Sequence, residues 1–219
     1  GAVVEEYNLA SQFRCSGSDG YLAWLDNVLG IRPTANDLLD RSDYEFKVFD
    51  TPEALHEAIE ARNSLNKARV VAGYCWPWLS KKDPMADDIV IGDYRRQWNL
   101  SQDGSLWIIA DKSIDQVGCI HTCQGLEVDY IGVIIGPDFI VRDGQVITSP
   151  DQRDKHDKSI RGYKKLSKAD PELAKRETDL IIKNTYRTLM TRGMKGCYVW
   201  SSDAETLGWM RGVGLSKNK

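Results

Sequence analysis

Residues 184–200 read NTYRTLMTRGMKGCYVW, and this stretch decides the class of fold. Its first part favours a helix that ends near a glycine, and residues 196–200 form a short, mostly apolar run typical of a buried strand. Residues 130–136, YIGVIIG, are a second apolar run without polar alternation. Such strands are typical of a parallel sheet that helices cover on both faces.

The rest of the chain alternates between helical and strand patterns. We expect further helices over residues 19–29, 52–66, 172–192 and 203–210, and further strands over 45–49, 69–75, 89–91 and 106–110. Residues 139–148 predict a hairpin that turns at Asp143-Gly144. This alternation predicts one three-layer α/β domain with a mostly parallel sheet.

Composition restricts the classes of function. The net charge of −3 excludes binding to nucleic acid through bulk positive charge, so such binding would need a local patch. No apolar run approaches the ~20 residues of a membrane span, and we expect no membrane partner. The five cysteines are an odd number in apolar contexts, which favours a reducing, cytoplasmic location. Cys119 and Cys123 with His121 could suggest a metal, but buried thiols fit their spacing better, and we predict no metal site.

Residues 149–168 stand out by charge. They hold seven basic and three acidic residues, a local net charge of +4, and few apolar residues. We predict a mobile, charged insertion loop. A solvated loop is the favoured interpretation, and a loop that contacts nucleic acid is the alternative.

Three short segments carry residue types suited to nucleotide chemistry. In residues 12–19, Phe13 offers an aromatic face for a base and Arg14 a forked cation for phosphate. In residues 120–129, Gly125 permits a close backbone approach and Glu127 could accept bonds from a ribose hydroxyl. In the third segment Arg192 follows the long helix. Taken singly, each has an ordinary structural explanation: a core aromatic, a satisfied histidine, or an arginine that caps a helix.

Tryptophans near arginines suggest a further contact with nucleic acid. Trp98 follows Arg95 and Arg96, and Trp76 and Trp78 lie in another loop region. Stacking on single-stranded bases is one interpretation, with Arg96 and Trp98 as the residues to watch. The alternative, which we favour, is that these rings cover the edge of a core.

In their order and spacing, the three segments resemble the later motifs of superfamily 1 helicases. These motifs are Gln12-Phe13-Arg14, then His-x-x-Gln-Gly-x-Glu from His121 to Glu127, then Thr-Arg-Gly at residues 191–193. The match is closer to the Schlafen-type DNA/RNA helicase domain family, through QFRC at 12–15 with YLAWLD at 21–26, and YRTLMTRG at 186–193. The resemblance covers nearly the whole chain and implies a RecA-like fold.

The resemblance also implies roles for particular residues. Arg192 would be an arginine finger, with Arg14 near the terminal phosphate as the second catalytic residue. The nucleotide-binding residues would be Gln12, Phe13, Gln124, Gly125 and Glu127. His121 and Thr122 would face a strand of single-stranded DNA or RNA. We expect these guanidinium groups to share a crevice beyond the carboxyl ends of the strands.

The sequence contains no Gly-x-x-x-x-Gly-Lys-Ser/Thr loop. In the family resembled, that loop and the magnesium ligands lie on the first RecA-like domain. We therefore expect residues 1–219 to be a second RecA-like domain excised from a longer ATP-dependent helicase. ATP and Mg would be its cofactors only together with the first domain, and the fragment alone would be inactive. A non-catalytic nucleic-acid or protein binding module, and an ATP-gated switch without unwinding, remain alternatives.

Overall fold

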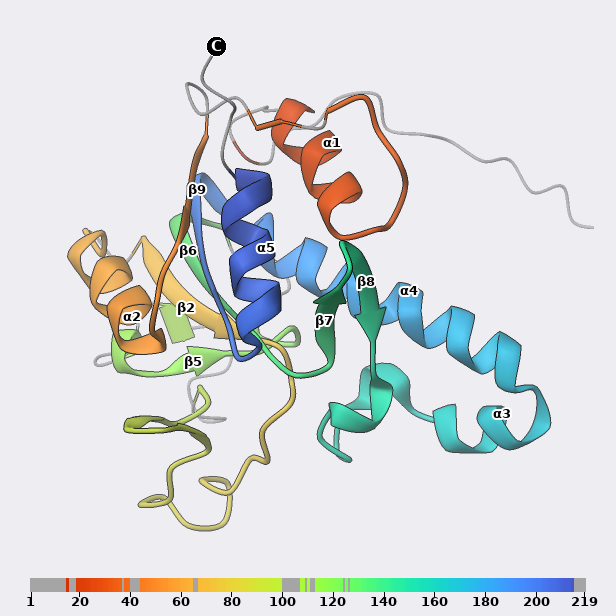
Figure 1. Ribbon diagram of the computed structural model, residues 1–219. Helices are drawn as coiled ribbons and strands as arrows, with labels where there is room; N and C mark the ends of the chain where they lie inside the picture. Colours follow the sequence, from red (N-terminus) through yellow and green to blue (C-terminus); the bar gives the residue numbers. More distant parts are fainter. Residues whose placement is uncertain are drawn as a thin grey trace, which may run out of the picture.

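A parallel five-stranded sheet forms the centre of the molecule (Figure 1). The computed structural model describes residues 15, 19–36, 38–39, 44–64, 67–99, 107–108, 110, 113–123, 125 and 127–214. The strand order is β1-β9-β6-β2-β5. The strands are β1 (Glu45–Val48), β2 (Ala68–Ala72), β5 (Val117–Gly118), β6 (Val128–Ile135) and β9 (Gly193–Ser201). The predicted α/β fold with a parallel sheet is thus confirmed.

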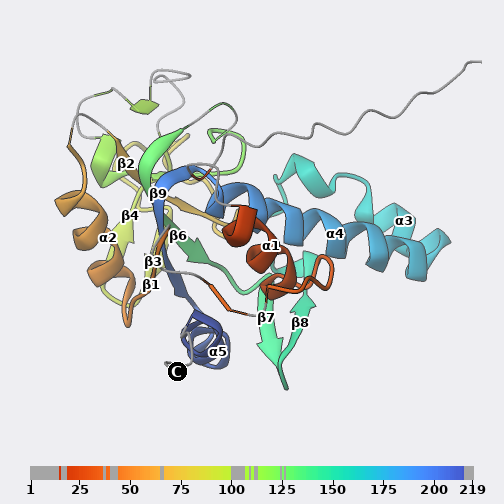
Figure 2. The ribbon, with the colours of Figure 1, turned by 90° about the horizontal axis from the view of Figure 1, so that it is seen from above.

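Helices cover both faces of this sheet, in three layers (Figure 2). On one face α2 (Pro52–Ala61) packs Leu55 and Ile59 against strand residues such as Val70 and Ile134. On the other face α1 (Asp19–Val28) and α4 (Pro171–Met190) pack against residues such as Val133. Because successive strand residues point to opposite faces, β6 is apolar on both sides and serves both cores.

Local sequence signals account for where the helices begin. The Thr51 hydroxyl accepts a hydrogen bond from the amide of Ala54, and Pro52 occupies the first turn of α2. Asp170 caps α4 in the same way through the amide of Leu173, and Pro171 follows it. A short helix, α3 (Tyr163–Ala169), lies beside the first turns of α4 (Figure 1).

Two antiparallel hairpins extend the central domain. β3 (Ile89–Ile91) pairs with β4 (Tyr94–Arg96), and β7 (Phe139–Arg142) pairs with β8 (Gln145–Thr148). The predicted turn at Asp143-Gly144 is present, with φ of 51° and 74°, the left-handed values that a two-residue hairpin turn requires.

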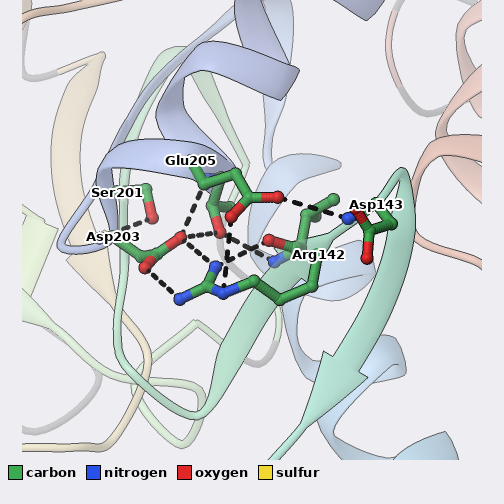
Figure 3. Close-up of polar contacts among 7 residues, drawn as sticks. Arg142, Asp143, Ser201, Asp203 and Glu205 are labelled. Carbon is green, nitrogen blue, oxygen red and sulfur yellow. Dashed lines mark hydrogen bonds and ion pairs between the residues drawn. The ribbon is translucent and has the colours of Figure 1, made fainter.

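An ion pair fastens the second hairpin to α5 (Ala204–Gly214), as Figure 3 shows. Arg142 donates to both carboxylate oxygens of Asp203 at 2.8 and 2.7 Å, and Asp203 also accepts from the amide of Thr206 at the start of α5. These donors, Arg142 first, lower the pKa of the Asp203 carboxyl. The carboxyl end of β9 is thereby joined to β7.

Several boundaries differ from the sequence prediction. The helix expected over 52–66 ends at Ala61, where Asn63 turns back and its side chain accepts from the amide of Ala68. In the strand expected over 106–110, Trp107 and Ile108 form a helical turn instead. The sequence reasoning also missed β4 and the two-residue β5, because strands this short carry no usable periodicity.

The insertion at residues 149–168 contains regular secondary structure. It contains 3₁₀ turns at Pro150–Gln152 and Lys158–Ile160 and runs into α3. The side chains of Arg153 and Asp157 are fully buried and paired, with 2.6 Å between Nε and Oδ2. The insertion therefore has internal structure, and its mobility stays a prediction. In the part of the chain that the structure describes, no helix combines the length and apolarity that crossing a membrane requires.

Candidate functional site

The second and third motifs meet at the amino ends of β6 and β9. The amide of Val128 donates to the carbonyl of Arg192 at 3.0 Å, and Val128 pairs with Gly193 in the sheet. Glu127 and Arg192 thus immediately precede two neighbouring parallel strands. We expected these residues beyond the carboxyl ends of the strands, and that placement is wrong. Both motifs precede their strands and therefore lie at the amino ends.

In the first motif, Cys15 contacts the residue that precedes Arg192. Its thiol is buried and donates to the carbonyl of Thr191 over 3.8 Å, across 176 positions of sequence. Gln12, Phe13 and Arg14 lie outside the described residues. The end of α4 is further held by Tyr21, whose hydroxyl donates to the Met190 carbonyl at 3.1 Å. This bond satisfies one of the carbonyls that a helix end leaves without an intrahelical partner.

Arg192 is built into this junction. The residue is 5% exposed, and its Nε donates to the carbonyl of Thr188 at 3.1 Å. Arg192 also lies near the buried Cys123. Burial raises the pKa of the Cys123 thiol, and the Arg192 guanidinium acts in the opposite direction. The arginine therefore lies at the carboxyl end of α4, where a cation is favoured by the helix dipole.

Gly193 follows Arg192 for a steric reason. A Cβ at this position would lie 2.1 Å from the carbonyl oxygen of Gly196 and 3.1 Å from the Ile131 side chain. Only glycine fits this close approach, so the third motif is partly a packing requirement. Glu127 and Gly125 are exposed beside this junction, Gly125 with a φ of 79°, whereas Gln124 lies outside the described residues.

His121 and Thr122 lie beside β5, which is an edge strand of the sheet. They follow β5, in a helical turn where the amides of Thr122 and Cys123 both donate to the Cys119 carbonyl. The Thr122 hydroxyl donates to Asn99 at 2.7 Å. The half-exposed His121 ring lies edge-on to Tyr74, which follows β2, and its Nε2 is 3.7 Å from Asp157 of the insertion. The turn is therefore a link between the insertion and the Arg192 junction.

The burial of Trp98 contradicts the prediction that it stacks on bases. Trp98 is 0% exposed, and its indole N–H donates to the carbonyl of Trp76 at 3.2 Å. It therefore presents no face to a base, as the favoured core interpretation anticipated. Arg96 is half-buried over the ring of Tyr94, and its Nη1 donates to the Arg95 carbonyl at 2.8 Å. Both side chains therefore have contacts within the protein.

A buried ionic network at the carboxyl ends of β2 and β6 was missed. Asp138 accepts from the Tyr186 hydroxyl at 2.5 Å, and its Oδ2 lies 3.7 Å from Arg153 Nε. Arg153 also contacts Asp157, and all three charged side chains are fully buried. Burial raises the pKa of Asp138, and Arg153 lowers it. The available signal was an aspartate directly after an apolar strand, but its partner lies in the insertion and could not be paired from sequence.

Thiols behave as the sequence suggested. Cys15, Cys119, Cys123 and Cys197 are buried thiols, and Cys75 is partly buried. Among the described residues, no three His, Cys, Asp or Glu side chains gather as ligands of a metal ion.

Comparisons with known proteins place this arrangement in a family. A family model described as "Schlafen group 3, DNA/RNA helicase domain" matches residues 1–203. An uncharacterized protein of Saccharomyces cerevisiae is 28% identical over 218 residues, which covers 91% of this chain. The chain spans 46% of that relative's length. No solved structure matches the chain.

Proposed function

Because this chain belongs to the Schlafen group 3 DNA/RNA helicase domain family, we propose that it acts as the second motor domain of a helicase-like ATPase. The observation that carries this proposal is the convergence of three distant motifs on one junction. Cys15, Glu127 and Arg192 lie at the amino edge of β6 and β9, joined by the Cys15–Thr191 and Val128–Arg192 contacts. This junction would face the first motor domain.

The residues present fit half of a nucleotide site. Arg192 supplies a cation, Glu127 an exposed carboxylate and Gly125 a backbone open to close approach. Arg192 would hold the terminal phosphate of ATP, and Glu127 would hold its sugar. Bound ATP with Mg would supply the phosphoryl transfer, and a phosphate loop on the partner domain would complete the site. A positioned arginine of this kind contributes ~10³–10⁵ in rate.

The test is a matched pair of substitutions in the intact protein. Arg192→Ala should lower the rate of ATP turnover by about a thousandfold, with Arg192→Lys intermediate because it keeps the charge and loses the fork. Arg176→Ala is the control, since Arg176 is exposed near the opposite end of α4. Thermal melting would show that each variant is folded. Equal turnover in the Arg192 and Arg176 variants would remove the finger role.

A second candidate function is a non-catalytic binding module. It is favoured by the 5% exposure of Arg192 and by its hydrogen bond to Thr188, which show that this arginine also has a structural use. An intact protein that binds a strand but never turns over ATP would support the module. ATP turnover without displacement of a labelled duplex strand would support an ATP-gated switch.

A further inference from the structure

A cleft of about 640 Å³ lies within residues 150–165, the folded insertion. Its walls are the two 3₁₀ turns, Pro150–Gln152 and Lys158–Ile160, and the start of α3. The lining includes five exposed basic residues: Lys155, Lys158, Arg161, Lys164 and Lys165. This volume is in the range of about 300–1,000 Å³ that ligand sites occupy.

The charge of the cleft is not neutralised locally. None of the five basic side chains forms an ion pair with a carboxylate in the described part of the chain. Two of the three aspartates that line the cleft are paired with other residues of its lining: Asp154 with His156 at 2.9 Å, and Asp157 with the buried Arg153 at 2.6 Å. A concave surface with an excess of one sign of charge concentrates the opposite charge, so this cleft attracts anions.

The floor of the cleft contains a buried cation with an unused donor. Arg153 lines the cleft, and its side chain is 0% exposed. Its Nη1 donates to the Thr185 hydroxyl at 3.4 Å, while its Nη2 has no hydrogen-bond partner among the described residues. Leaving such a donor unpaired is costly, and the positive charge of Arg153 adds to the attraction of the cleft for a phosphate.

The cleft is held rigidly against the central sheet. The amide of Asp154 donates to the carbonyl of Tyr74, just after β2, at 2.9 Å. Arg153 lies 3.7 Å from Asp138, just after β6, and His121 lies 3.7 Å from Asp157. A ligand in the cleft would therefore lie beside the histidine of the second motif.

We propose that this cleft binds the phosphate backbone of a single-stranded nucleic acid. Five basic side chains along an open cleft exceed what one phosphate needs and suit successive phosphates of a chain. The choice of a strand rests on the proposed function, whereas the anion site rests on the cleft alone. Strand binding would then take place at the opposite edge of the sheet from Arg192, with His121 between the two.

Fluorescence anisotropy of a labelled strand of about 20 nucleotides tests this in the intact protein without ATP. The cleft variant is Lys158→Gln/Arg161→Gln. The matched control is Lys175→Gln/Arg176→Gln, which removes one lysine and one arginine from exposed positions of α4 outside the cleft. We expect the cleft variant to lose about tenfold in affinity and its salt dependence to fall by about 1.4 in log–log slope, ~0.7 for each lost phosphate contact. The control should stay within about twofold, since it removes no contact.

Equal loss in both variants would reduce the effect to bulk charge and overturn the proposal, as would an unchanged affinity in the cleft variant. Inorganic phosphate is the second probe. If it displaces the strand at equal phosphate concentration, the cleft is a site for a small free anion and not for a strand. Because the assay contains no nucleotide, failure of the Arg192 prediction would leave these outcomes unaffected, and the two ideas fail separately.

Discussion

Substitution Tyr186→Phe isolates the hydroxyl at the centre of the buried network. The ring is 0% exposed and packs against Phe139, so phenylalanine keeps the packing and removes one oxygen. That oxygen donates to Asp138 at 2.5 Å and accepts from the amide of Gly136 at 2.9 Å. Both partners are buried and would lose a contact that water cannot replace.

The magnitude follows from these two bonds. A hydrogen bond to a charged acceptor contributes about 1.5–3 kcal/mol, and an unpaired buried N–H costs about 1–3 kcal/mol. Since one hydroxyl makes both bonds and the effects overlap, we expect the free energy of unfolding to fall by about 3 kcal/mol. With a urea m-value of about 2–3 kcal/mol/M, the midpoint should fall by about 1 M.

The loss should also depend on pH. Burial raises the pKa of Asp138, and the Tyr186 hydroxyl opposes this by stabilising the carboxylate. Without the hydroxyl, the folded-state pKa rises further above the unfolded value of about 3.9. A raised folded pKa gives stability that is fully present below the unfolded pKa and is lost as pH rises. The cost of Tyr186→Phe should therefore be smaller below about pH 4 than at pH 7.

Urea unfolding followed by tryptophan fluorescence at both pH values measures this. Tyr163→Phe is the matched control, because Tyr163 is half-buried and its hydroxyl has no hydrogen-bond partner among the described residues. It should change the free energy of unfolding by less than about 0.5 kcal/mol. A cost for Tyr186→Phe that is as small as the control's, or the same at both pH values, would refute the account of the network.

Two further predictions concern stability. Burial lowers the pKa of His56, and its neutral ring bonds the Tyr94 hydroxyl and the Ile114 carbonyl at 2.8 Å each. Because the folded state favours the neutral ring, the stability that His56 contributes is present above its unfolded pKa of about 6.5 and is lost as the pH falls below that value. His56→Gln should flatten the decline in unfolding free energy between about pH 7 and 5, and identical slopes would contradict this. Gly193→Ala should cost about 1–3 kcal/mol by overpacking. Gly208→Ala, whose added Cβ meets no atom within 4 Å, should be neutral or stabilising by up to ~1 kcal/mol, and a thermal melt compares the two.

The strongest sequence signals were local ones, and these determined much of the fold. The apolar runs of β6 and β9 predicted strands buried on both faces, and Asp143-Gly144 predicted the hairpin turn between β7 and β8. Proline and capping residues marked the start of α2. Each signal arises from contacts within a few residues or from burial on both faces, and both leave a readable pattern.

The candidate site was only half readable. The sequence singled out Glu127 and Arg192, but only pairing between β6 and β9 showed that they are neighbours and lie at the amino edge. Trp98 and an exposed tryptophan have the same sequence signal, and packing alone decided that Trp98 is core. Charge counting likewise could not separate a solvated loop from a folded insertion.

Sequence by itself determined the layered α/β architecture and the residues that carry the family's motifs, because periodicity, caps and turns are encoded locally. Tertiary structure alone decided which edge of the sheet holds Arg192, and that Arg153 joins Asp138 to Asp157 beneath the insertion. The physical reason is that long-range pairing of charges and strands depends on how distant segments pack, and a single sequence leaves no periodic trace of that packing.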